Sequence, residues 1–130
     1  MRHRRHRPED LIQRAVIQHL KIRAAPGVVF WHHPAGGLRS PVEAAIMKGL
    51  GAMAGVSDLI AVRPSLCQCG ATKAEIYALE LKTKDGRATA EQVEFIHRIN
   101  DAGGYGAIAY GLDAALSCLE AWKLLLGKAS

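Results

Sequence analysis

The tripeptide Glu80-Leu81-Lys82 is the part of this sequence that most clearly suggests chemistry. It lies in a β-branched and apolar stretch, 75–83, that we predict to be a strand, and residues two apart in a strand point the same way. Glu80 and Lys82 should therefore project from one face, while Leu79 and Leu81 project from the other face into the core. A carboxylate beside an ammonium is often only a surface ion pair, so the tripeptide alone does not establish a site.

Asp58 supplies a second carboxylate, at the start of an apolar run, 58–62, that we predict to be a neighbouring strand. A glycine-rich stretch, 49–55, precedes it and would let a substrate approach the backbone closely. Two carboxylates on adjacent strands can share a hard cation, because Mg²⁺ and Mn²⁺ usually take only one or two protein carboxylates. We expect Asp58 and Glu80 to hold such an ion, which would activate water and neutralise charge on a phosphodiester.

Lys82 and Gln92 are the candidate accessory residues. Lys82 is a compact cation that can orient the attacking water or stabilise the negative charge that grows on the phosphate. Gln92 lies in the first turn of a predicted helix and can hydrogen-bond the same water or Lys82. It is also the last member of a capping box that begins at Thr89, so it can satisfy the Thr89 backbone. The two roles of Gln92 are compatible.

Glu9 and a pair of histidines are further candidates. Glu9 lies in the first turn of a predicted helix, 8–23, where the helix dipole favours a carboxylate whatever its function, and Asp10 competes with it for the role of an extra metal ligand. His32 and His33 end a predicted strand, and adjacent strand residues face opposite ways, so at most one should enter the site. We favour His33, as a base or a phosphate contact.

The chain carries a formal net charge of +5 and favours polyanionic partners, although charge alone does not establish nucleic-acid binding. Much of the positive charge lies in a basic N-terminal arm, 1–7, which is either a solvated tail or a phosphate-contacting segment. The candidate nucleic-acid contacts are Arg4, Arg5, Arg7, His33, Lys48, Lys84 and Arg87.

Length and composition predict one compact domain, 8–130, since the chain has 130 residues and 49% of them are hydrophobic. No apolar stretch follows the basic arm, so the N-terminus resembles neither a secretory signal nor a membrane span. Three cysteines, an odd number, favour a reducing compartment, and we expect a cytoplasmic rather than a secreted protein. Cys67 and Cys69 could begin a soft-metal site, but no second Cys/His pair completes a zinc site.

The elements that must position these residues alternate between helices and strands. We predict that Arg63 and Pro64 stop the second strand and that 66–74 is a turn or hairpin connection. The order of elements predicts an α/β sandwich with a mixed central sheet flanked by helices. The expected elements are a helix over 8–23, a strand over 28–33, a helix over 41–48, strands over 58–62 and 75–83, a helix that starts at 89 and is closed by Gly103-Gly104, a strand over 105–110, and a helix from about 113.

The assembled pattern resembles the virus-type replication-repair nuclease (VRR-NUC) domain of the PD-(D/E)xK nuclease superfamily, found alone in phages and fused to larger repair nucleases. The similarity spans roughly 9–111. Two departures are Ser57, which replaces the proline of the superfamily's name, and His33, which stands where a polar amide is expected. The segments that carry the resemblance are Gly55-Val56-Ser57-Asp58-Leu59-Ile60, Leu79-Glu80-Leu81-Lys82, Ala90-Glu91-Gln92 and an opening helix with Glu9-Asp10-Leu11-Ile12-Gln13.

The resemblance implies a restriction-endonuclease-like core and a Mg²⁺- or Mn²⁺-dependent endodeoxyribonuclease. It implies metal binding by Asp58 and Glu80 with help from Glu9, Lys82 as the catalytic lysine and Gln92 as the accessory glutamine. It also implies a homodimer that cleaves branched DNA or a Holliday junction, in DNA repair or in the host cytoplasm if the protein is phage-encoded. The alternative is a non-catalytic DNA-binding relative of the same fold, against which the intact catalytic set argues.

Overall fold

The computed structural model describes residues 8–34 and 40–127. The types and order of the elements agree with those predicted from the sequence. No helix within these two ranges has the length and the apolar character needed to cross a membrane. The elements are α1 (Pro8–Arg23), β1 (Val29–His32), α2 (Pro41–Gly49), β2 (Leu59–Leu66), β3 (Thr72–Lys82), α3 (Ala90–Asp101), β4 (Tyr105–Tyr110) and α4 (Leu112–Ala121).

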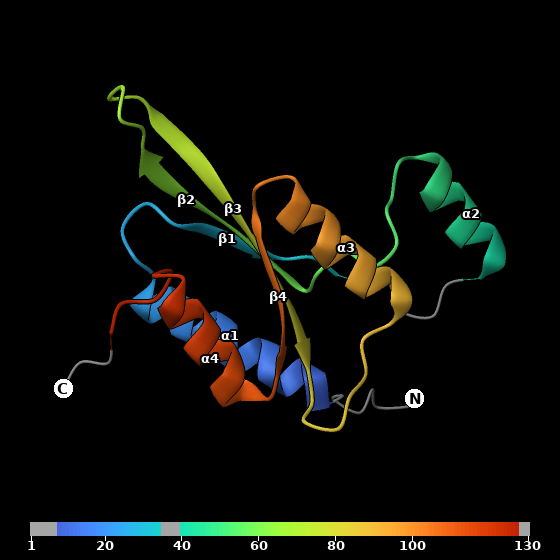
Figure 1. Ribbon diagram of the computed structural model, residues 1–130. Coiled ribbons are helices and arrows are strands. Elements are labelled where there is room, and N and C mark those ends of the chain that lie inside the picture. Colours follow the sequence, from blue (N-terminus) through green and yellow to red (C-terminus); the bar gives the residue numbers. More distant parts are fainter. Residues whose placement is uncertain (1–7, 35–39, 128–130) are drawn as a thin grey trace.

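The strands form one four-stranded sheet in the order β1-β2-β3-β4 (Figure 1). The first three strands pair antiparallel, and β4 joins β3 in parallel. Since parallel neighbours need a crossover, α3 connects β3 to β4. In Figure 1, α1 and α4 lie together on one side of the sheet and α3 lies on the other. The predicted mixed α/β architecture is therefore confirmed.

The hydrophobic core lies between the sheet and the pair α1 and α4. Leu79 and Leu81 of β3 are buried in it, against Val16 and Leu20 of α1 and Leu119 of α4. The predicted core face of β3 is therefore confirmed, and it follows from the two-residue period of a strand. Burying each of these side chains contributes about 1.5–3 kcal/mol of hydrophobic stabilisation.

The hairpin of β2 and β3 is longer than we predicted. Arg63 and Pro64 do not stop β2, which continues to Leu66, and β3 already begins at Thr72. Pro64 pairs with Ala74, and β1 pairs only with the first half of β2, so the outer edge of β2 has no partner strand at this point in the described chain. An edge of this kind tolerates proline, because no ladder hydrogen bond is lost there.

Candidate active site

Asp58 stands directly before β2, beside the end of β3 that carries Glu80 and Lys82. Its Oδ2 atom accepts a 2.9 Å hydrogen bond from the backbone N–H of Leu81. The side chain of Leu81 points into the core, while its N–H holds the carboxylate of Asp58 between the two polar residues of the tripeptide. This bond uses Oδ2 and leaves Oδ1 for another partner. The predicted proximity of Asp58 to the tripeptide is therefore present in the structure.

The end of β1 holds the main chain of Asp58. The backbone N–H of His33 donates a 2.8 Å hydrogen bond to the Asp58 carbonyl oxygen. The ring Nδ1 of His32 lies 2.8 Å from the same oxygen, and since a carbonyl only accepts, this contact requires a proton on Nδ1. The sequence favoured the side chain of His33 and missed this positioning role of His32. A phosphate contact by His33 stays a prediction.

Glu80 is almost completely buried, with 2% of its surface exposed. Its Oε1 atom accepts a 2.8 Å hydrogen bond from Gln92 Nε2 and lies 3.6 Å from Lys82 Nζ. Its Oε2 atom is buried without a hydrogen-bond partner. Burial, followed by the nearby charge of Asp58, raises the pKa of Glu80 to about 8, although Lys82 acts in the opposite direction. An ionised Glu80 needs a further positive charge beside it to offset its burial and the charge of Asp58.

Lys82 is buried beside two carboxylates. Its Nζ atom lies 3.6 Å from Glu80 Oε1 and 3.9 Å from Glu9 Oε1. Glu9 reaches this position from the first turn of α1, so the opening helix and the end of β3 meet at the ammonium group. The strand therefore presents Lys82 at the same place as Glu80, as the sequence pattern predicted.

Gln92 completes the predicted capping box, but its amide donates to Glu80 and not to Lys82, the partner that the sequence suggested beside the water. Its side-chain Oε1 accepts from the backbone N–H of Thr89, and its backbone N–H donates to Thr89 Oγ1, so the capping box is complete. At the same time, its Nε2 atom donates to Glu80. The cap of α3 thus fixes the amide that orients the buried carboxylate.

Gly55 brings the segment before Asp58 close to the start of α3. Its φ of +81° is one that residues with a side chain rarely adopt, and a Cβ atom there would lie 2.3 Å from the Glu91 carbonyl oxygen. It would also lie 2.8 Å from the backbone nitrogen of Gln92. Only glycine permits this approach, so Gly55 helps to set where Asp58 and Gln92 stand relative to each other.

The residues present fit a hard divalent cation. Glu80 Oε2 is a buried oxygen without a partner, and Asp58 lies next to it with one oxygen uncommitted to Leu81. Two carboxylates are enough for Mg²⁺ or Mn²⁺, which complete their shells with water and phosphate oxygens. Within 8–34 and 40–127 no group of three or more His, Cys, Asp or Glu residues could hold a metal. Glu9 lies beside Lys82, and its role as a ligand stays a prediction.

The candidate nucleic-acid contacts are spread along the chain. Lys84 and Arg87 are exposed on the loop that joins β3 to α3, between Lys82 and Gln92 in the sequence. Lys48 is exposed on α2. Arg4, Arg5 and Arg7 lie outside the described residues.

Comparison with known proteins identifies the fold. No protein-family model and no curated protein matches the chain. A solved structure described as "VRR_NUC domain protein" superimposes with a TM-score of 0.69 at 24% sequence identity, and the match covers 93% of each chain. The chain therefore has the fold of a VRR-NUC domain, with the mixed sheet and flanking helices of a restriction-endonuclease-like core.

Proposed function

We propose that the protein is a metal-dependent endodeoxyribonuclease of the VRR-NUC type. The observation that carries this proposal is the buried Glu80 carboxylate, whose unpaired Oε2 lies beside Asp58 and whose other oxygen is held by Lys82 and Gln92. Structural ion pairs rarely leave a buried carboxylate oxygen unpaired, because the desolvation of a charge is costly. A bound cation would be the missing partner of Glu80 Oε2, so a cation-binding site explains why this oxygen is unpaired.

Asp58 and Glu80 would hold Mg²⁺ or Mn²⁺, with Glu9 as a further candidate. Such a cation lowers the pKa of a bound water and neutralises charge on the scissile phosphate. The backbone N–H of Leu81 keeps Asp58 in place, and Gln92 fixes the orientation of Glu80. Lys82 supplies a positive charge that orients the attacking water or stabilises the charge that develops on the phosphate.

The substrate is DNA, and we propose branched DNA such as a Holliday junction, cleaved by a homodimer. The net charge of +5 and the exposed Lys84 and Arg87 on the loop after β3 favour a polyanion. Paired incisions in a junction require two active sites, which a small chain with a single catalytic set supplies by pairing with a second copy. On this proposal the protein acts in the cytoplasm, in DNA repair or during phage replication.

The test compares cleavage of plasmid, linear, single-stranded and four-way-junction DNA in Mg²⁺, in Mn²⁺ and in EDTA. Asp58→Ala and Lys82→Ala should abolish cleavage, whereas Asp101→Asn, which removes an exposed carboxylate at the end of α3, should not. Equal cleavage by the wild type and both active-site variants would overturn the assignment. Binding to the four substrates without cleavage in either metal would instead favour the non-catalytic DNA-binding alternative.

A further inference from the structure

Helix α2 has no buried residue, although its sequence is apolar. All nine of its residues are exposed, and in Figure 1 it stands apart from the sheet and from the other helices. A helix of this length is marginal in water by itself and depends on packing of its apolar side. The large apolar side chains of α2 and of the segment that follows it are between 37% and 79% exposed, and they are Val42, Ile46, Met47, Leu50 and Met53.

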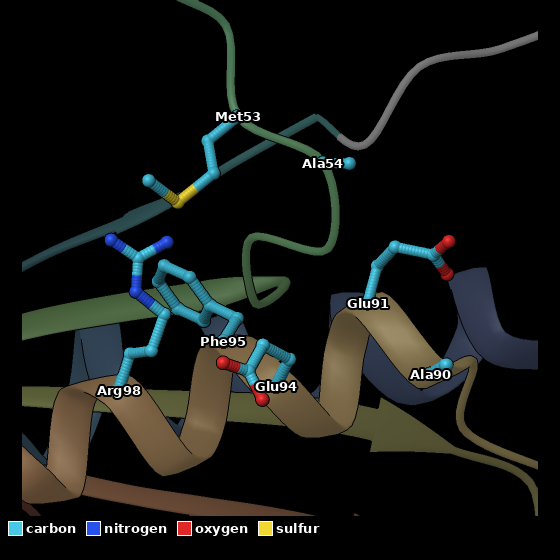
Figure 2. A pocket seen from close by; sticks show the side chains of 7 residues that line it. All are labelled: Met53, Ala54, Ala90, Glu91, Glu94, Phe95 and Arg98. Atoms are coloured by element: carbon cyan, nitrogen blue, oxygen red, sulfur yellow. The ribbon is translucent and has the colours of Figure 1, made fainter.

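An apolar groove lies between the segment after α2 and helix α3. A cavity of about 310 Å³ opens there, and in Figure 2 Met53 leans over Phe95 with Arg98 beside them, while Glu91 lies nearer the start of α3. A second cavity of about 330 Å³ shares Met53 and Ala54 and extends to Ala44, Met47 and Lys48 of α2. The groove therefore has an apolar floor and a charged rim.

We propose that α2 of one copy docks into the α3 groove of a second copy, so that two chains exchange their α2 helices across one symmetric interface. The helix and the groove are both apolar at their centres. Helix α2 carries Glu43 in its first turn and Lys48 in its last turn. The groove carries Glu91, Glu94 and Arg98, so each surface has charges that can pair with opposite charges on the other. Because both surfaces are on every chain, a reciprocal exchange about a two-fold axis forms the contact twice and closes on itself, whereas a one-way contact would build a longer chain of copies. Such a pairing covers the large exposed apolar side chains that a monomer leaves in water.

The chain's own α2 stands at the rim of its groove and does not cover it. Only three residues separate the end of α2 at Gly49 from Met53, which itself lines the groove. The four steps from Gly49 to Met53 span at most about 14 Å even when fully extended, and here they include the turn at Gly51, whose φ is +101°. The groove is therefore open to the helix of a second chain.

The interface adjoins the proposed active site. Met53 and Ala54 lead directly to Gly55, which lies against Glu91 and Gln92 at the start of α3. Gln92 in turn holds Glu80. Docking would press this segment onto α3 and support the position of Gln92, so pairing of two chains supports each site. This interface rests on the homodimer of the proposed function and gives that dimer its contact surface. Docking of α2 does not require the protein to cleave DNA.

The first test measures the dissociation constant of the full-length dimer by sedimentation equilibrium. Ile46→Gln with Leu50→Gln should raise the dissociation constant at least tenfold while the circular dichroism spectrum is unchanged, because both side chains are exposed in one chain. The matched control is Leu11→Gln with Ile22→Gln on α1. Ile46 and Leu50 are 58% and 79% exposed, and Leu11 and Ile22 are 58% and 83% exposed. This control should leave the dimer intact.

A charge exchange tests the orientation of the helix in the groove. Lys48→Glu and Glu94→Lys should each weaken the dimer, and the two together should recover most of the lost affinity, since the pair of opposite charges is restored. The inactive Lys82→Ala variant should dimerise like the wild type, which separates the interface from the proposed catalysis.

Two results would overturn the inference. A wild-type chain that stays monomeric at every concentration reached excludes the interface. A dimer that the α2 variant leaves unchanged, or that the α1 control weakens equally, shows that α2 is not the docking element. Neither result bears on the nuclease assignment, which the cleavage assay tests.

Discussion

Replacing Glu80 with glutamine should stabilise the metal-free protein and at the same time abolish cleavage. In the wild type, Glu80 Oε2 is buried without a partner beside Asp58. The amide of a glutamine removes the charge, offers a donor toward Asp58, and keeps the oxygen that accepts from Gln92. Near and above pH 8, where Glu80 is ionised in the folded protein, the change therefore relieves an unfavourable contact that exists because the site is built for a cation.

The size and sign of this effect follow from the pKa of Glu80, which burial and Asp58 raise from 4.5 to about 8. Between these values the folded protein holds a proton that the unfolded chain has lost, so the free energy of unfolding falls as pH rises and reaches its low value above about pH 8. The difference between these two pKa values, at 1.36 kcal/mol per pH unit, limits the loss in the free energy of unfolding to about 4–5 kcal/mol. Water entering the site screens part of this, and we expect roughly 2 kcal/mol.

The assay is urea unfolding in EDTA from pH 6 to pH 9, with Asp101→Asn as the control for loss of an exposed carboxylate. The wild type should lose stability across this range, whereas Glu80→Gln should lose much less and should be the more stable protein at pH 8. Addition of Mg²⁺ at pH 8 should stabilise the wild type and not the variant. Parallel pH profiles for the two proteins, or a variant less stable than the wild type at pH 8, would refute this reasoning.

Four further substitutions test the positions around Glu80. Asp58→Asn should reduce junction cleavage at least about 100-fold without unfolding the protein, since it presents an amide to the cation, and near-normal activity would contradict its role. Lys82→Arg keeps the charge but not the compact ammonium, so kcat should fall about tenfold or more, and an unchanged kcat would show that charge alone suffices. Gly55→Ala should cost more than about 1 kcal/mol of stability and lower kcat, because its Cβ would meet the Glu91 carbonyl, and wild-type values for both would show that the segment is free to move. Leu79→Ala should cost about 2–5 kcal/mol in urea unfolding, whereas Leu11→Ala on the exposed side of α1 should cost much less, and similar losses would contradict the assigned core.

Features governed by neighbours along the chain could be predicted from the sequence. The two-residue period of a strand was enough to put Leu79 in the core and to bring Glu80 and Lys82 together, because alternation is a property of the extended backbone itself. The capping box from Thr89 to Gln92 is likewise local, since its hydrogen bonds join residues three apart. Such local patterns predict the same structure wherever they occur in a fold.

Features that depend on the edges and faces of the sheet needed the tertiary structure. Pro64 was predicted to end β2, yet the edge beside it has no partner strand, so the missing N–H does no harm. The bond from Leu81 to Asp58 and the contact of His32 with the Asp58 carbonyl join segments more than 20 residues apart, and no local pattern records them.

The site shows the same division between sequence and tertiary structure. The sequence by itself determined which residue types stand where, and through strand alternation that Glu80 accompanies Lys82. Only the fold decided that Glu80 is buried beside Asp58, with a raised pKa and an unpaired oxygen, and that α2 is left exposed. The physical reason is that burial and electrostatic interaction depend on distances in space, which are set when β2, β3 and α3 pack together.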